Sequence, residues 1–157
     1  MEALLQAVGN WPGAVLLQES GTAYLFVNAA HILGVGLILG AMLPLNLRLI
    51  GLFRTTPLDT LGPFLTRSAA TGVALAVLTG LWLFSVKPQE YIGNSAFLCK
   101  IALLALAFLD IALQHSGGQF RIAVAGGSVH ARVRVLAALS AALWIAVLVA
   151  GRWIGFL

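Results

Sequence analysis

The chain has 157 residues, of which 61% are hydrophobic and only 9% are charged. Soluble domains carry about a quarter of their residues as Asp, Glu, Lys or Arg, so this composition excludes a water-soluble globular protein. The net charge of +4 comes from nine basic residues scattered along the chain, which indicate membrane topology and lipid contacts rather than binding to nucleic acid. We therefore expect residues 1–157 to form a single integral membrane domain surrounded by membrane lipids.

The segment 1–20 precedes the first long apolar run. Its apolar side chains recur at helical spacing around polar Gln6 and Asn10, although Pro12 and Gly13 interrupt the pattern. This pattern predicts a short helix that lies in the membrane interface, and a disordered tail is the alternative.

Four apolar runs follow, and each is close to the roughly 20 residues that cross a bilayer core. They cover about residues 22–48, 68–86, 96–114 and 132–152. Pro57 and Pro63 fall between the first two runs and predict a loop there rather than a continuing helix. The predicted fold is all-α, a four-transmembrane-helix bundle with a short N-terminal interfacial helix.

The basic residues are unevenly divided between the two ends of such a bundle. Six flank the two loops at one end: Arg48, Arg54, Arg67, Arg121, Arg132 and Arg134. Three fall at the other end: Lys87, Lys100 and Arg152. Because Lys and Arg favour the cytoplasmic side, we expect both termini to face the exterior or periplasm of a bacterial inner membrane.

His31 is the most informative polar residue inside a span. It lies about nine residues into the first run, roughly 13 Å below the outer surface, so its side chain cannot reach water. Tyr24 and Asn28 share its helix face, and Gly34 continues that face as a groove for a flat ligand or a close helix. Imidazole can bind haem iron, with Asn28 holding its other nitrogen, or it can make an interhelical hydrogen bond.

Two cationic residues from other spans fall in the same leaflet as His31. Lys100 lies about five residues into the third span, where its side chain either extends to the headgroups or turns inward. Arg152 ends the fourth span, where a guanidinium can hold a haem propionate, a quinone oxygen or a lipid phosphate.

A second polar group lies near the opposite side of the membrane. Its members are Asn46, Arg48, Asp110, His115 and His130. Arg48 and Asp110 fall at comparable depth, and we expect them to form a structural ion pair. The pair Gly36 and Gly40 predicts close helix contact, either within the chain or between two copies in a homodimer.

Three segments carry a resemblance to known families: HILGVGLILGAMLPLNLRLIGL, FLCKIALLALAFLDIALQH and ARVRVLAALSAALWIAVLVAGRWIGF. Over about residues 20–157 the chain resembles small, functionally uncharacterised bacterial four-helix membrane proteins, which usually carry an acidic residue in place of Asn46. In His31, Lys100 and His115 it is more distantly similar to the CopD copper-resistance and HemJ-type protoporphyrinogen oxidase membrane proteins. This resemblance implies a b-type haem or redox role centred on His31.

The sequence therefore predicts a membrane-embedded, haem b-associated redox or electron-transfer protein. In this hypothesis His31 binds the iron, Lys100 is a second ligand or handles protons, Arg152 holds a propionate, and a quinone or another electron-transfer protein is the partner. The alternative is a non-catalytic membrane protein, either an accessory subunit of a larger membrane complex or a protein that handles copper or a small solute. Copper is the weaker branch, because Met1, Met42 and Cys99 are the only soft ligands in the sequence.

Overall fold

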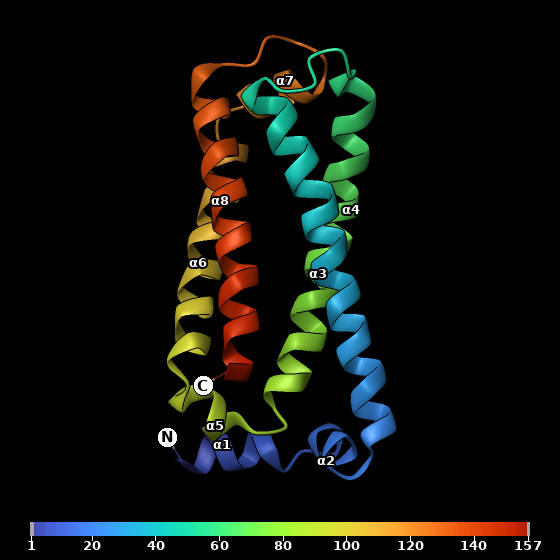
Figure 1. Cartoon of the computed structure of the whole chain (residues 1–157), viewed down its shortest axis with the longest axis vertical. Coiled ribbons are helices and arrows are strands. Elements are labelled where there is room, and N and C mark those ends of the chain that lie inside the picture. Colours follow the sequence, from blue (N-terminus) through green and yellow to red (C-terminus); the bar gives the residue numbers. More distant parts are fainter. Residues whose placement is uncertain (1, 157) are drawn as a thin grey trace.

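The computed structural model describes residues 2–156, and these residues contain helices and no strand. Four long helices run side by side along the molecule (Figure 1). They are α3 (Gly21–Ile50), α4 (Leu58–Phe84), α6 (Ser95–His115) and α8 (Ala131–Trp153). Each is long and apolar enough to cross a membrane. The predicted all-α bundle with four spans is confirmed, and the protein is a multi-pass membrane protein.

Short helices cover the two ends of the bundle. α1 (Glu2–Gly9), α2 (Pro12–Glu19) and α5 (Pro88–Gly93) lie at one end, and α7 (Gln119–Val124) lies at the other (Figure 1). The last turn, η1 (Ile154–Phe156), follows α8. Because the number of spans is even, the two ends of the chain lie at the same end of the bundle, beside α1, α2 and α5.

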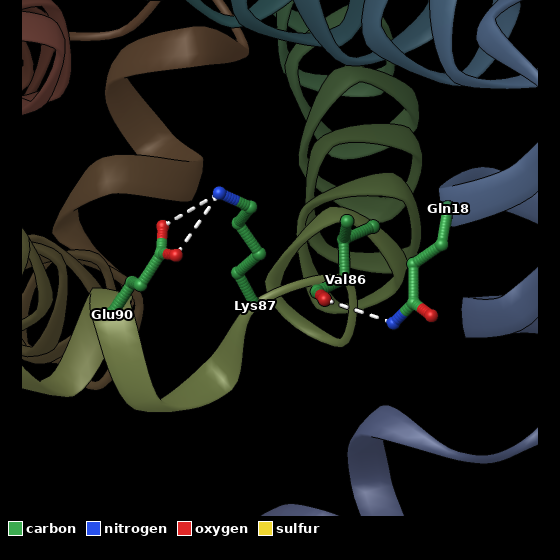
Figure 2. Close-up of polar contacts among 4 residues, drawn as sticks. All are labelled: Gln18, Val86, Lys87 and Glu90. Carbon is green, nitrogen blue, oxygen red and sulfur yellow. Dashed lines mark hydrogen bonds and ion pairs between the residues drawn. The ribbon is translucent and has the colours of Figure 1, made fainter.

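The N-terminal segment forms two short helices that are held against the bundle by polar contacts. The indole nitrogen of Trp11 donates a hydrogen bond to the hydroxyl of Ser85 at 3.0 Å, and that of Trp82 donates to the carbonyl of Gly13 at 2.8 Å. The amide of Gln18 donates to the carbonyl of Val86 at 3.0 Å (Figure 2). The expected interfacial segment is therefore an ordered pair of helices fixed to the end of α4.

α4 begins ten residues earlier than the sequence predicts. Pro57 is its N-cap, and Pro63 lies inside the helix rather than in a loop. Pro63 is the sixth residue of α4, and because proline has no N–H, the helix lacks the hydrogen bond from this position to the carbonyl of Asp59. At 27 residues α4 is about 40 Å long and exceeds the roughly 30 Å hydrocarbon core, so its first turns can extend beyond the apolar region.

The bundle consists of two closely packed helix pairs. α3 packs most extensively on α4, and α6 packs on α8, while α3 also contacts α8. The backbones of α3 and α4 touch where two glycines meet: a Cβ built on Gly72 would lie 2.8 Å from the carbonyl oxygen of Gly34. A Cβ on Gly36 or Gly40 would meet nothing within 4 Å. Close contact within the chain therefore uses Gly34 and Gly72, whereas the homodimer alternative for Gly36 and Gly40 stays a prediction.

Candidate functional site

His31 projects from α3 onto α4, where its ring is fixed by hydrogen bonds. Its Nδ1 lies 3.0 Å from the carbonyl oxygen of Ala76 and 3.1 Å from the hydroxyl oxygen of Thr79. The Thr79 hydroxyl donates its own proton to the carbonyl of Leu75 at 2.6 Å, so toward His31 it can only accept. Since a carbonyl also only accepts, Nδ1 must carry the hydrogen. In a neutral imidazole Nε2 then keeps its lone pair.

A glycine beneath the ring gives His31 the space it occupies. A Cβ built on Gly80 would lie 3.0 Å from Cε1 and 3.4 Å from Nδ1 of His31. The imidazole therefore lies against the bare backbone of α4 and is held by Ala76, Thr79 and Gly80 together. Within residues 2–156, no hydrogen bond reaches Nε2, so this nitrogen is available to a ligand.

His31 lines a cavity of about 410 Å³ between the four long helices. The walls are almost wholly apolar and include Phe84, Phe97 and Trp144, while His31 and Lys100 are the titratable side chains among the described lining residues. This volume falls in the range of small-molecule sites, which are mostly apolar with a few placed polar groups. The arrangement fits a ligand with an apolar body and one or two polar atoms.

The side chain of Lys100 faces the interior of the bundle. Its Nζ would lie 3.5 Å from a Cβ built on Gly151 of α8, so the side chain runs along that glycine. It lines the same cavity as His31. Among the residues that the structure describes, none forms a hydrogen bond or ion pair with Nζ. Of the two orientations expected for Lys100, toward the headgroups or inward, the structure has the side chain facing the cavity inside the bundle.

The cavity is bordered by side chains that face the lipid. Leu81 is 64% exposed, and Val77, Ile101 and Leu148 are also exposed while lining the cavity. Surfaces of this kind on a membrane-spanning bundle contact acyl chains. A lipophilic molecule can therefore approach His31 and Lys100 from within the bilayer.

Four residues that the sequence placed in a site with His31 take no part in it. Asn28 does not hold the imidazole, because Ala76 and Thr79 do so. The groove at Gly34 is filled by α4: a Cβ there would lie 2.8 Å from the amide nitrogen of Ala76. It therefore admits a close helix and not a flat ligand.

The other two of these residues, Tyr24 and Arg152, are on the outside of the bundle. Tyr24 is 36% exposed and does not line the cavity. The guanidinium carbon of Arg152 lies 5.0 Å from the centroid of the Phe156 ring, in a cation–π contact on an exposed surface. Neither side chain joins His31 and Lys100.

Sequence reasoning did not find the α4 side of the site. Thr79 was the available signal, because it is a polar residue deep within a span that has no charged residue. Its side chain is 8% exposed, and its hydroxyl bonds back to its own helix while accepting from His31. Ala76 and Gly80 carry no such signal, because Ala76 contributes its backbone carbonyl and Gly80 contributes only the space that a side chain would fill.

The expected ion pair between Arg48 and Asp110 is not formed. Arg48 lies in the last turn of α3 and donates from Nε to the carbonyl of Thr56 at 2.8 Å, and from a terminal nitrogen to that of Arg54 at 3.0 Å. The one ion pair in the described part of the chain joins Lys87 and Glu90 at 2.9 Å, at the opposite end of the bundle (Figure 2). The carbonyls of the loop after α3 are within reach of Arg48, and they bind it instead.

The other two histidines are engaged locally, away from the cavity at His31. His115 Nδ1 donates to the carbonyl of Ile111 at 2.8 Å, and His130 Nδ1 accepts from the backbone nitrogen of Arg132 as the N-cap of α8. Residues 2–156 contain no group of three or more His, Cys, Asp or Glu side chains arranged to hold a metal ion. Cys99 is exposed on α6.

No protein-family model, curated protein or solved structure matches the chain. The resemblance to the CopD and HemJ-type families stays a prediction, and the functional argument rests on the geometry around His31.

Proposed function

We propose that the protein is a membrane-embedded redox protein that binds a b-type haem through His31. The observation that supports this most strongly is the hydrogen bond from Nδ1 of His31 to the carbonyl of Ala76, which leaves the lone pair on Nε2. Histidines that bind metals usually donate their other ring hydrogen to a carbonyl or carboxylate, and haem iron is commonly held by such a histidine. An interhelical hydrogen bond alone does not require the adjoining apolar cavity.

The side chains around the cavity fit a haem in two respects. Nε2 of His31 is an available axial ligand, and the apolar walls suit a porphyrin that enters from the lipid. Lys100 is the cation available for one propionate, whereas Arg152 lies on the outer surface and has no part in the site. When bound, the haem supplies a one-electron couple, and the protein sets its orientation and surroundings.

A quinone is the second candidate, because the cavity offers one cation rather than two. A quinone head group carries no charge, so it needs no second cation in a low-dielectric region. The ammonium of Lys100 can donate a hydrogen bond to a quinone oxygen, and Nε2 of His31 can accept a proton from a quinol hydroxyl. The exposed apolar rim suits the isoprenoid tail of such a molecule.

An absorption spectrum of detergent-purified protein, expressed with ample haem, tests the haem proposal. We expect a Soret band that disappears in His31→Ala and persists in His130→Asn, where asparagine retains the capping role of a histidine at the other end of the bundle. A colourless wild-type protein, or an unchanged spectrum in His31→Ala, would contradict haem binding at His31.

A separate measurement tests the quinone. A soluble quinone analogue should quench the fluorescence of Trp144, which lines the cavity, and Lys100→Met should weaken this effect. If neither haem nor quinone analogue binds, the accessory-subunit alternative becomes the leading hypothesis.

We also propose that the protein lies in a bacterial inner membrane with both termini outside. The two ends of the chain lie at the end of the bundle with three of the basic residues, and the loops around α7 lie at the end with six. The excess of arginine around α7 favours the cytoplasm for that end.

A further inference from the structure

A second cavity lies between the long helices and α7, nearer that end of the bundle than the site at His31. Its volume is about 380 Å³, and α3, α4, α6, α7 and α8 contribute to its walls. Five of its side chains carry a buried polar atom that has no partner among the described residues: Asn46, Asp110, Gln114, Ser140 and Trp144. All such atoms that the structure records line this one cavity.

These polar side chains are almost completely buried. Asn46 and Ser140 are 2% exposed, Asp110 and Trp144 are 3% exposed, and Gln114 is 8% exposed. A buried polar group without a partner costs about 1–3 kcal/mol, so five such groups in one cavity indicate that it holds ordered water or a polar ligand. The free atoms include both donors and acceptors, and an apolar molecule satisfies neither.

Three of the free atoms are oxygens on two adjacent helices. Asp110 and Gln114 are one turn apart on α6, and Ser140 lies on α8, which packs against α6. The amide nitrogen of Gln114 donates to the carbonyl of Val133 at 3.5 Å, so its Oε1 is the atom left for a ligand. A carboxylate, an amide oxygen and a hydroxyl together form a donor set that suits a hard cation.

The carboxylate has no countercharge from the protein. Within residues 2–156, no Lys, Arg or His nitrogen lies within ion-pair distance of Asp110, and Arg48 is bound to loop carbonyls. The other titratable side chain that lines the cavity, His115, hydrogen-bonds the carbonyl of Ile111 and packs on Phe120. An isolated carboxylate in a low-dielectric interior needs a cation or a proton.

We propose that this cavity binds a partly hydrated monovalent alkali cation through Asp110, Gln114 and Ser140. One unit of positive charge neutralises the single carboxylate, whereas a divalent ion would leave an uncompensated charge within the membrane. The cavity has room for several waters, each of which takes about 30 Å³ in the liquid. Further waters in the cavity, beyond those that coordinate the ion, can accept hydrogen bonds from the amide of Asn46 and the indole of Trp144, which satisfies the two remaining donors.

Thermal unfolding of the detergent-purified full chain tests this site with sodium as the probe. At constant ionic strength, replacing choline chloride with NaCl should raise Tm saturably, by about 5 °C or more when the site is filled. Asp110→Asn keeps the shape of the side chain but removes its charge, so Tm should no longer respond to sodium even if this variant is more stable in choline. Glu19→Gln removes a charge from an exposed position and should respond like the wild type.

Direct binding of radioactive sodium gives an independent measurement. We expect about one ion per chain, lost in Asp110→Asn and weakened in Ser140→Ala, and competition by KCl would show that the site accepts alkali cations in general. The proposal is overturned if sodium has no effect, if Asp110→Asn retains the effect, or if calcium binds in preference. Stabilisation by acid alone, with no response to sodium, would show instead that Asp110 carries a proton.

Discussion

The Nδ1 atom of His31 in α3 lies 3.0 Å from the carbonyl oxygen of Ala76 in α4, and this contact determines which ring nitrogen is free. The hydroxyl of Thr79 accepts from the same nitrogen at 3.1 Å, and Gly80 lies beneath the ring. The orientation of the histidine is therefore a property of α4 as much as of α3.

Substitutions in α4 that leave His31 in place should still impair the site. In Gly80→Ala the new methyl group would lie 3.0 Å from Cε1, so the ring must move. We expect haem affinity to fall by about 10–100-fold, the usual effect of disturbing a partner of a metal-binding histidine. Titration with haemin measures this, with Gly36→Ala as the control because nothing lies within 4 Å of its Cβ.

The tautomer of His31 gives a test that does not depend on haem. Nitrogen NMR of labelled protein should show the hydrogen of His31 on Nδ1 in the wild type and a changed signal in Gly80→Ala. A hydrogen on Nε2 in the wild type would contradict the geometry of the site.

Contact between the backbones of α3 and α4 should make Gly72 intolerant of a side chain. The Cβ of Gly72→Ala would lie 2.8 Å from the carbonyl oxygen of Gly34, so the helices must separate. We expect a loss of about 1–3 kcal/mol, typical of overpacking, in unfolding by denaturing detergent. Gly40→Ala, whose Cβ meets nothing, should cause no loss, and equal effects of the two substitutions would refute the contact.

Arg48 and Asp110 should contribute independently to stability. Arg48 binds the carbonyls of Arg54 and Thr56, and Asp110 faces the second cavity. In a double-mutant cycle with Arg48→Ala and Asp110→Asn, the two changes in the free energy of unfolding should add to within about 0.5 kcal/mol, whatever the sign of each. A coupling energy well above that value would contradict this prediction and support the ion pair between Arg48 and Asp110 that the sequence suggested.

The uneven distribution of arginine predicts the orientation of the bundle in the membrane. A reporter fused after Gly118 should have cytoplasmic activity, and one fused at the C-terminus should have exterior activity. Activity of each reporter on the opposite side would reverse the proposed orientation.

Alkaline pH should loosen the contacts of Tyr91, which lies in α5 outside the spans. Burial raises the pKa of its phenol above the ordinary value of 10.0, and the nearby Tyr24 and Glu90 raise it further. Because the folded state then holds the proton more tightly than the unfolded state, this contribution to stability is complete below pH 10.0 and is lost as the pH rises above it. Absorbance titration should show one late-titrating phenol that is absent in Tyr91→Phe, and this variant should lose less stability at high pH.

The sequence by itself determined the number and helical nature of the spans and the position of His31 within the first of them. Hydrocarbon cannot satisfy backbone hydrogen bonds, so an apolar run of sufficient length must form a helix. The same reasoning indicated that Lys100 lies near His31 in depth. It placed the start of the second span too late, because the first turns of α4 contain Arg67 and Pro63 and are not apolar.

The tertiary structure decided what each polar side chain contacts. Helical spacing shows which residues share a face, as Asn28 and His31 do, but it does not show which helix that face meets or at what rotation. α4 supplies the carbonyl that orients His31 and fills the groove at Gly34, whereas the loop after α3 takes Arg48 away from Asp110. These choices depend on how the helices pack and on which acceptors lie within reach, and both are set by contacts between segments far apart in the sequence.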